Sequence, residues 1–172
     1  LTEDEAQGFS FFEASFITAG MHKLISDGLA RLAGLSGSAV YHLKQAMGGG
    51  KTHLLSGFGL VARHPRVRER YFADIAYGRE FGAAKLAFFN GRNNPAGFFW
   101  GDISEQLGKP NFFEPGTKAP DEKSWLNLFA GDEPILILSG RVQADATFLT
   151  KLGSSQRHCD WLRQRQHRSS NR

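Results

Sequence analysis

The sequence predicts an α/β domain in which a parallel sheet is covered by helices on both faces. Segments with strand character alternate with amphipathic helical segments along the chain. The segment Pro134–Leu138 contains the uninterrupted apolar run Ile-Leu-Ile-Leu, which is typical of a strand buried on both faces of a parallel sheet. With 172 residues and 41% hydrophobic residues, the chain is long enough to form one domain with a substantial core.

The first half of the chain contains two predicted helices and one predicted strand. Residues 1–15 are acidic and rich in phenylalanine and lead into the domain. Met21–Leu35 carries its apolar residues at helical spacing and predicts an amphipathic helix. A Gly-Ser turn separates this helix from a short strand at Ala39–Leu43. Lys51–Arg63 predicts a second helix, which its two interior glycines weaken by roughly 1 kcal/mol each.

The second half repeats the alternation of strands and helices. Arg63–Tyr71 is a charged connection containing a proline, and Lys85–Phe89 is the second predicted strand. A loop with the sequence Asn-Gly-Arg-Asn-Asn-Pro follows this strand. Phe98–Leu107 predicts an aromatic-rich helix, and Asp121 is suited to cap a short helix that ends near Phe129. Pro134–Leu138 is the third predicted strand.

The charge of the chain is concentrated in its last part. From Arg141 onward there are seven basic and two acidic residues, so the net charge of +4 arises there. The apolar periodicity also fades after Leu138. We therefore divide the chain into a lead-in segment 1–15, a core 16–138 and a basic tail 139–172. The tail is either a nucleic-acid-binding segment, which contacts phosphates, or a solvated, disordered end. We hypothesise that it was translated in a shifted reading frame or marks a truncation.

The sequence favours a cytoplasmic protein. No apolar stretch approaches the roughly 20 residues that a membrane-spanning helix requires, so we expect no membrane association. The acidic start Leu-Thr-Glu-Asp-Glu is unlike a signal peptide. Cys159 is the single cysteine, which excludes an internal disulfide and fits a reducing compartment. The start at Leu1 suggests that the chain is a fragment.

The strongest functional signal is the run Met47-Gly48-Gly49-Gly50-Lys51-Thr52-His53. Glycines allow backbone N–H groups to approach phosphate oxygens without a Cβ in the way. Lys51 can place its charge between the β- and γ-phosphates of a nucleotide, and the Thr52 hydroxyl can bind the accompanying Mg²⁺. The run therefore predicts a P-loop, or Walker A motif, that binds a nucleotide with Mg²⁺.

The context of this motif strengthens it. The general pattern is G-x-x-x-x-G-K-[ST], and Gln45 stands where its first glycine would be. A predicted strand ends just before the glycines and a predicted helix begins at Lys51, so the helix N-terminus would face the phosphates. The alternative is a flexible glycine-rich turn with an incidental lysine.

Several motifs together resemble a known family. They are Phe16-Ile17-Thr18, the run from Gly48 to His53, Trp100-Gly101-Asp102-Ile103 with Gln106-Leu107-Gly108, and Pro134–Leu138. Their order is similar to the N-terminal part of a family of large prokaryotic AAA-type ATPases known as a domain of unknown function. Some members are linked to phage defence. The resemblance spans roughly residues 9 to 138, and such members also tolerate a residue other than glycine at the position of Gln45.

The resemblance implies a partial AAA-type core that binds ATP and Mg²⁺ and works as a homo-oligomer or in a larger complex. It also implies that Ile135–Leu138 is the Walker B strand, which in such proteins ends in Asp-Glu. In this chain Ser139, Gly140 and Arg141 follow the strand instead. Asp132 and Glu133 precede the strand, so we expect them at the wrong edge of the sheet.

Other candidate residues carry weaker signals. Asp145 is the nearest acid after the third strand, although nothing in its spacing favours a catalytic role. The resemblance places Ile17 and Thr18 near the adenine, and it leaves His53 either in the motif or in a packing role. Trp100 and the neighbouring phenylalanines are expected in the core. The tail also contains three possible metal ligands without a fourth, which argues against a metal site there: His158, Cys159 and His167.

Three functions remain open at this point. The first is an ATP hydrolase domain that drives motion in a larger assembly. The second is an inactive remnant that binds nucleotide without turning it over, which the missing acids favour. The third is a nucleic-acid-binding fragment that acts through the basic tail. The catalytic residues stay unassigned.

Overall fold

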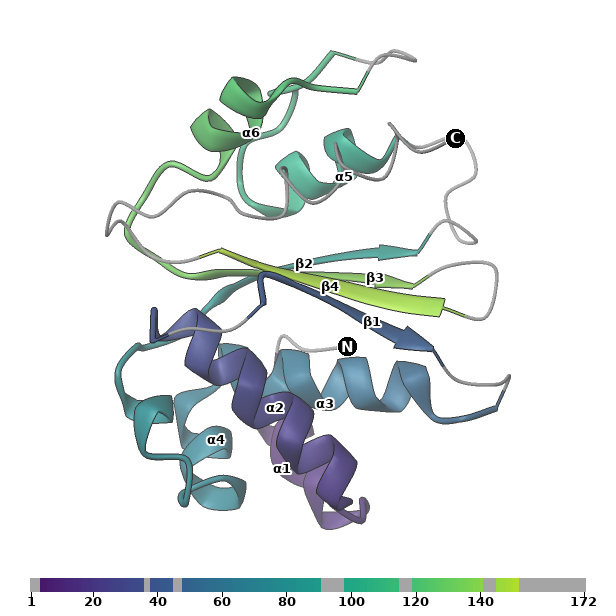
Figure 1. Cartoon of the computed structure of the whole chain (residues 1–172), viewed down its shortest axis with the longest axis vertical. Coiled ribbons are helices and arrows are strands. Elements are labelled where there is room, and N and C mark those ends of the chain that lie inside the picture. Colours follow the sequence, from purple (N-terminus) through teal and green to yellow (C-terminus); the bar gives the residue numbers. More distant parts are fainter. Residues whose placement is uncertain are drawn as a thin grey trace.

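The computed structural model describes residues 4–35, 38–44, 48–90, 98–114, 119–140 and 145–151, with the backbone alone for residues 90 and 145–151. Helices and strands alternate along much of the chain (Figure 1). In chain order the elements are α1 (Glu5–Glu13), α2 (Ala19–Leu32), β1 (Val40–Lys44), α3 (Lys51–Arg63), α4 (Pro65–Tyr71), the 3₁₀ helix η1 (Ala76–Arg79), β2 (Lys85–Asn90), α5 (Phe99–Gln106), α6 (Glu122–Leu128), β3 (Ile135–Gly140) and β4 (Asp145–Lys151).

The strands form one mixed sheet in the order β1-β4-β3-β2. β2 and β3 pair in parallel, with Lys85 opposite Ile135. β4 pairs antiparallel with both β1 and β3. Because β4 runs against both neighbours, β1, β2 and β3 all point the same way. Their carboxyl ends therefore lie at one edge of the sheet (Figure 1).

Helices cover both faces of the sheet, as the sequence predicts. α1 to α4 lie on one face, and α5 and α6 lie on the other (Figure 1). Alternate side chains of β3 enter the two cores: Leu136 and Leu138 pack toward α1 to α4, whereas Ile135 and Ile137 pack toward α5 and α6. All four are at most 5% exposed. The uninterrupted apolar run follows from this burial on both faces, since neither face of the strand meets water.

The pairing within the sheet corrects one sequence expectation. A wholly parallel sheet was expected, but only β2 and β3 pair in parallel. The difference is due to β4, a strand that lies within the segment expected to be a basic tail. Residues 145–148 alternate polar and apolar types, and the segment 145–151 includes β-forming threonine and phenylalanine, which are typical of a strand. Between β1 and β3, the segment provides hydrogen-bonding partners for the backbone of both strands.

Two helices also lie where the sequence predicted none. In the lead-in segment, Asp4 caps α1 by accepting a hydrogen bond at Oδ1 from the backbone N–H of Ala6 (2.9 Å). In the charged connection, Pro65 begins α4, where a missing N–H has no helical partner to lose. The two helices contact each other and α3, and Val67 of α4 is fully buried. Tertiary burial therefore stabilises these short helices.

Close packing of α2 on α3 depends on a glycine. A Cβ at Gly28 would lie 2.3 Å from Cζ of Phe58, which is fully buried. Gly57 likewise faces Met21, where a Cβ would lie 2.5 Å from the methionine methyl carbon. Gly57, one of the two glycines that weaken α3 as an isolated helix, thus allows α2 to approach it closely.

The helices are short. α2, with 14 residues, is shorter than the roughly 20 residues needed to span a bilayer. Within the described part of the chain, no helix is both long and apolar enough to cross a membrane.

Candidate functional site

The glycine run lies at a strand-to-helix corner. β1 ends at Lys44 and α3 begins at Lys51, so the loop joins the carboxyl end of a strand to the amino end of a helix (Figure 1). Gly48, Gly49 and Gly50 are all exposed. Met47, also predicted to belong to the site, and Gln45 lie outside the described residues.

Two of these glycines have backbone conformations that other residues rarely adopt. Gly48 has φ of 80° and Gly50 has φ of 74°, both in the left-handed region. A Cβ at either position would meet nothing within 4 Å. The constraint at these positions is therefore the backbone conformation, and the space above them is open. An anion can approach the loop from that side.

The first turn of α3 is suited to hold an anion. Gly50 is the N-cap residue and has no side chain, so it makes no side-chain cap to the first amides of the helix. The first turn contains no acidic residue. Helix dipole and Lys51 together place positive charge at this corner. Lys51 is half-buried and Thr52 is exposed, one residue into the helix.

His53 has a packing contact beside the loop. Its ring stacks on Phe11 of α1, with the ring centres 4.4 Å apart and an angle of 26° between the planes. This contact joins α1 to the first turn of α3. The structure thus gives His53 a packing partner, and the residue still lies within the first turn that carries Lys51 and Thr52.

β3 ends in uncharged residues, at the edge where the glycine loop lies. Ser139 and Gly140 end the strand and are half-buried. They pair with Phe89 and Asn90 at the end of β2. Residue 141, which follows the strand in the sequence, lies outside the described residues. An Asp-Glu pair is therefore missing at the end of this strand, as the sequence indicated.

The acids before β3 lie at the other edge. Glu133 precedes the strand and forms an ion pair with Lys85, the first residue of β2, at 2.7 Å between carboxylate oxygen and Nζ. Asp132 is exposed next to it. Both acids are separated from the glycine loop by the length of the strands, and the expectation that they lie at the other edge of the sheet is confirmed.

Asp145 has a position that its spacing in the sequence did not indicate. It is the first residue of β4, and its Cα pairs with that of Lys44, the last residue of β1. The backbone of Asp145 therefore lies at the same edge of the sheet as the glycine loop. Sequence reasoning missed this position because β4 itself was not predicted.

The remaining sequence candidates fall into structural roles or outside the described residues. Thr18 caps α2, accepting a hydrogen bond at Oγ1 from the N–H of Met21 (3.1 Å), and Ile17 packs against the core on the face of α1 to α4. Trp100 packs with the core beneath α5 and α6, as predicted. Among the described residues there is no group of three metal-ligating side chains. The three tail residues considered as metal ligands lie beyond residue 151.

Comparisons of the chain with protein-family models, with characterised proteins and with solved structures found no match. The resemblance to AAA-type ATPases therefore rests on the motifs in the sequence.

Proposed function

We propose that this protein binds the triphosphate of ATP, with Mg²⁺, on the loop that precedes α3. One observation carries the proposal: exposed glycines with left-handed backbone lie directly before Lys51 and Thr52, at a strand-to-helix corner. An incidental glycine-rich turn does not require that lysine and threonine open a helix at the carboxyl edge of a sheet. Helix N-termini at this edge are preferred sites for phosphate groups.

Each residue of the loop has a role in this proposal. The backbone amides from Gly48 to Lys51 would surround the phosphates, because glycine leaves them accessible. Lys51 would place its charge between the β- and γ-phosphates, and the Thr52 hydroxyl would bind Mg²⁺. His53 would support the first turn of α3 through its stack on Phe11. Met47 completes the sequence motif. We also propose that the fold is a partial P-loop core of the AAA type.

We expect binding without efficient hydrolysis. Phosphoryl transfer to water requires an acid that positions the metal shell and another that orients the water. Ser139 and Gly140 end the strand where these acids would be expected. Turnover should therefore be lower by several orders of magnitude than in an ATPase that has both acids. Among the functions left open by the sequence, these features favour a nucleotide-binding domain with little activity.

Calorimetry with ATP, in the presence and absence of Mg²⁺, tests the proposal. Lys51→Ala should weaken binding by at least about tenfold, because it removes the one charged side chain assigned to the phosphates. Lys123→Ala is the matched control, since Lys123 is an exposed lysine on α6, across the sheet from α3. Circular dichroism of each variant would verify that the fold is retained. Equal ATP affinity in the wild type and in Lys51→Ala would disprove the proposal.

A phosphate-release assay tests the expected lack of turnover. Activity that Lys51→Ala abolishes would show a working ATPase and contradict that part of the proposal. In that case Asp145→Asn, compared with Asp132→Asn at the opposite edge, would show whether the acid that starts β4 contributes to turnover.

A further inference from the structure

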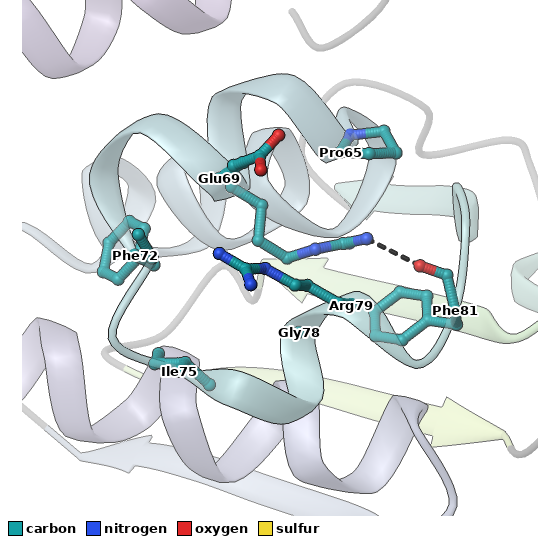
Figure 2. A pocket seen from close by; sticks show the side chains of 9 residues that line it. Pro65, Glu69, Phe72, Ile75, Gly78, Arg79 and Phe81 are labelled. Carbon is teal, nitrogen blue, oxygen red and sulfur yellow. Dashed lines mark hydrogen bonds between the residues drawn. The ribbon is translucent and has the colours of Figure 1, made fainter.

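A second concave site lies far from the glycine loop. α4, η1 and the residues next to them line a partly open cavity of about 210 Å³ (Figure 2). Its apolar lining residues include Phe72, Ala73, Ile75 and Phe81. Its charged lining residues are Arg68, Glu69 and Arg79. We refer to it as the α4–η1 pocket.

Arg68 is a buried cation in this pocket. Only 3% of its surface is exposed, and its guanidinium lies 4.2 Å from the ring centre of Phe81. Nη1 donates to the carbonyl oxygens of Val61 (3.1 Å) and Ala62 (3.4 Å), in the last turn of α3. Nη2 donates to those of Phe81 (2.8 Å) and Gly82 (2.9 Å). These bonds fix the position of the guanidinium.

No acidic side chain neutralises Arg68. Within the described residues it forms no ion pair, and its Nε–H donates no hydrogen bond. Burial lowers the pKa of Arg68 to about 10, so the side chain is still charged at neutral pH. Carbonyl oxygens stabilise a cation but carry no net charge. Among the residues that the structure describes, this buried positive charge in the pocket lining therefore has no counter-ion.

A second arginine extends into the same space. Figure 2 shows the side chain of Arg79 running across the pocket below Glu69, toward Phe72. Arg79 and Glu69 are both exposed and line the same pocket, yet neither forms an ion pair within the described residues. The pocket lining thus contains two guanidinium groups and one carboxylate, so it carries an excess of positive charge.

We propose that the α4–η1 pocket binds a small oxyanion, a carboxylate or a phosphate, attached to an apolar or aromatic body. Arg79 is exposed and forms no ion pair within the described residues, so it can turn its planar guanidinium toward the oxyanion and bind it through two parallel hydrogen bonds. Arg68 adds the field of a fixed buried charge. The half-buried ring of Phe81 and the exposed Ala73 provide apolar contact for the body of the ligand.

This site is distinct from the glycine loop. Arg68 contacts the last turn of α3, whereas the glycine loop precedes the first turn of the same helix. The two sites therefore lie at opposite ends of a 13-residue helix, about 20 Å apart along its axis. The proposal does not depend on nucleotide binding.

Calorimetry or ligand-observed NMR on the full chain tests the proposal with three probes. Benzoate and phenyl phosphate carry the two kinds of oxyanion, and benzamide is the neutral match. We expect one or both anions to bind and benzamide to bind about tenfold more weakly or not at all. The stronger anion identifies which oxyanion the pocket prefers. Failure of both anions to bind, or equal binding of benzamide, would overturn the proposal.

Variants locate the binding. Arg79→Ala should weaken anion binding about tenfold, and its matched control Arg70→Ala, an exposed arginine of α4 outside the pocket lining, should not. Ala73 is exposed and lines the pocket, so the large side chain of Ala73→Trp should fill the pocket and abolish anion binding. Binding that survives Ala73→Trp would place the anion elsewhere and refute the assignment.

Discussion

The two ends of α3 are built in different ways. At its start, exposed glycines place the chain in left-handed conformations, and the amides of the first turn have no side-chain cap. At its end, the buried Arg68 donates to carbonyl oxygens of the last turn and of a distant loop. The N-cap residue at the start makes no side-chain hydrogen bond to the helix, whereas at the end a buried side chain pairs with the backbone. Substitutions at the start should therefore affect binding, and substitutions at the end should affect stability.

The largest expected effect is at the end of the helix. Arg68→Met should lower the free energy of unfolding by about 3–5 kcal/mol, because it removes the donor to four carbonyl oxygens at buried or half-buried positions, of which that of Ala62 keeps the N–H of Ala84. Denaturant unfolding followed by circular dichroism measures this change. Arg70→Ala, an exposed substitution on the same helix, should stay within about 0.5 kcal/mol. Similar values for the two variants would show that the carbonyl contacts of Arg68 do not stabilise the fold.

A substitution in α2, where this helix packs on the middle of α3, should have a smaller effect on stability. Gly28→Ala gains about 1 kcal/mol of helix propensity but forces a methyl group against the buried ring of Phe58. We expect a net loss of about 2 kcal/mol in thermal or denaturant unfolding. Gly20→Ala in the same helix provides the control, since a Cβ there has only a distant contact with Thr18 (3.9 Å). If both variants are stabilised, α2 and α3 do not pack as closely as described.

At the start of the helix, the backbone conformation of Gly50 should affect both stability and binding. Gly50→Ala must hold an alanine at positive φ, which costs about 1 kcal/mol of stability. The methyl group meets no neighbouring atom, so the loss comes from conformation alone. Calorimetry of the variant should also show weaker ATP binding, because the loop no longer favours the geometry that presents its amides. If Gly50→Ala changes neither the stability nor the ATP affinity, the left-handed conformation at this position is not needed for folding or binding.

Lys51→Ala should have the smallest effect on stability and a large effect on ligand affinity. Lys51 opens the helix at a half-buried position, and alanine is a good helix former. We expect a change in unfolding free energy within about 0.5 kcal/mol, together with the loss of ATP affinity described above. Thermal unfolding with and without Mg-ATP measures both, because ligand raises the midpoint only where it binds. A strong loss of stability without ligand would show that the two ends of α3 do not differ as proposed.

Much of the fold could be predicted from local sequence patterns. The burial of β3 on both faces follows from its uninterrupted apolar run, and the cap of α6 follows from Asp121, whose Oδ1 accepts from the N–H of Ser124 at 2.8 Å. The strand-to-helix corner at Lys51 was predictable because a glycine run ends a β-forming segment and begins an amphipathic one. Each of these features depends on residues that are adjacent in the chain.

The features that were missed depend on distant partners. α4 has a charged sequence, and its burial becomes visible only once α1 and α3 lie beside it. Arg68 resembles any surface arginine in the sequence, because its acceptors include Phe81 and Gly82 in another segment. β4 was missed because its strand pattern lies in a segment of basic composition, and its place between β1 and β3 arises from pairing with both.

The sequence by itself determined the glycine loop, its lysine and threonine, the uncharged end of β3 and the alternation of helices with strands. These are local properties, set by backbone conformation and side-chain chemistry over a few residues. Only the tertiary structure decided that β4 runs antiparallel within the sheet, that Asp145 begins it at the edge of the glycine loop, and that Arg68 and Arg79 share a pocket. Such arrangements depend on which surfaces, far apart in the sequence, pack against each other and exclude water. Local sequence patterns do not reveal these pairings.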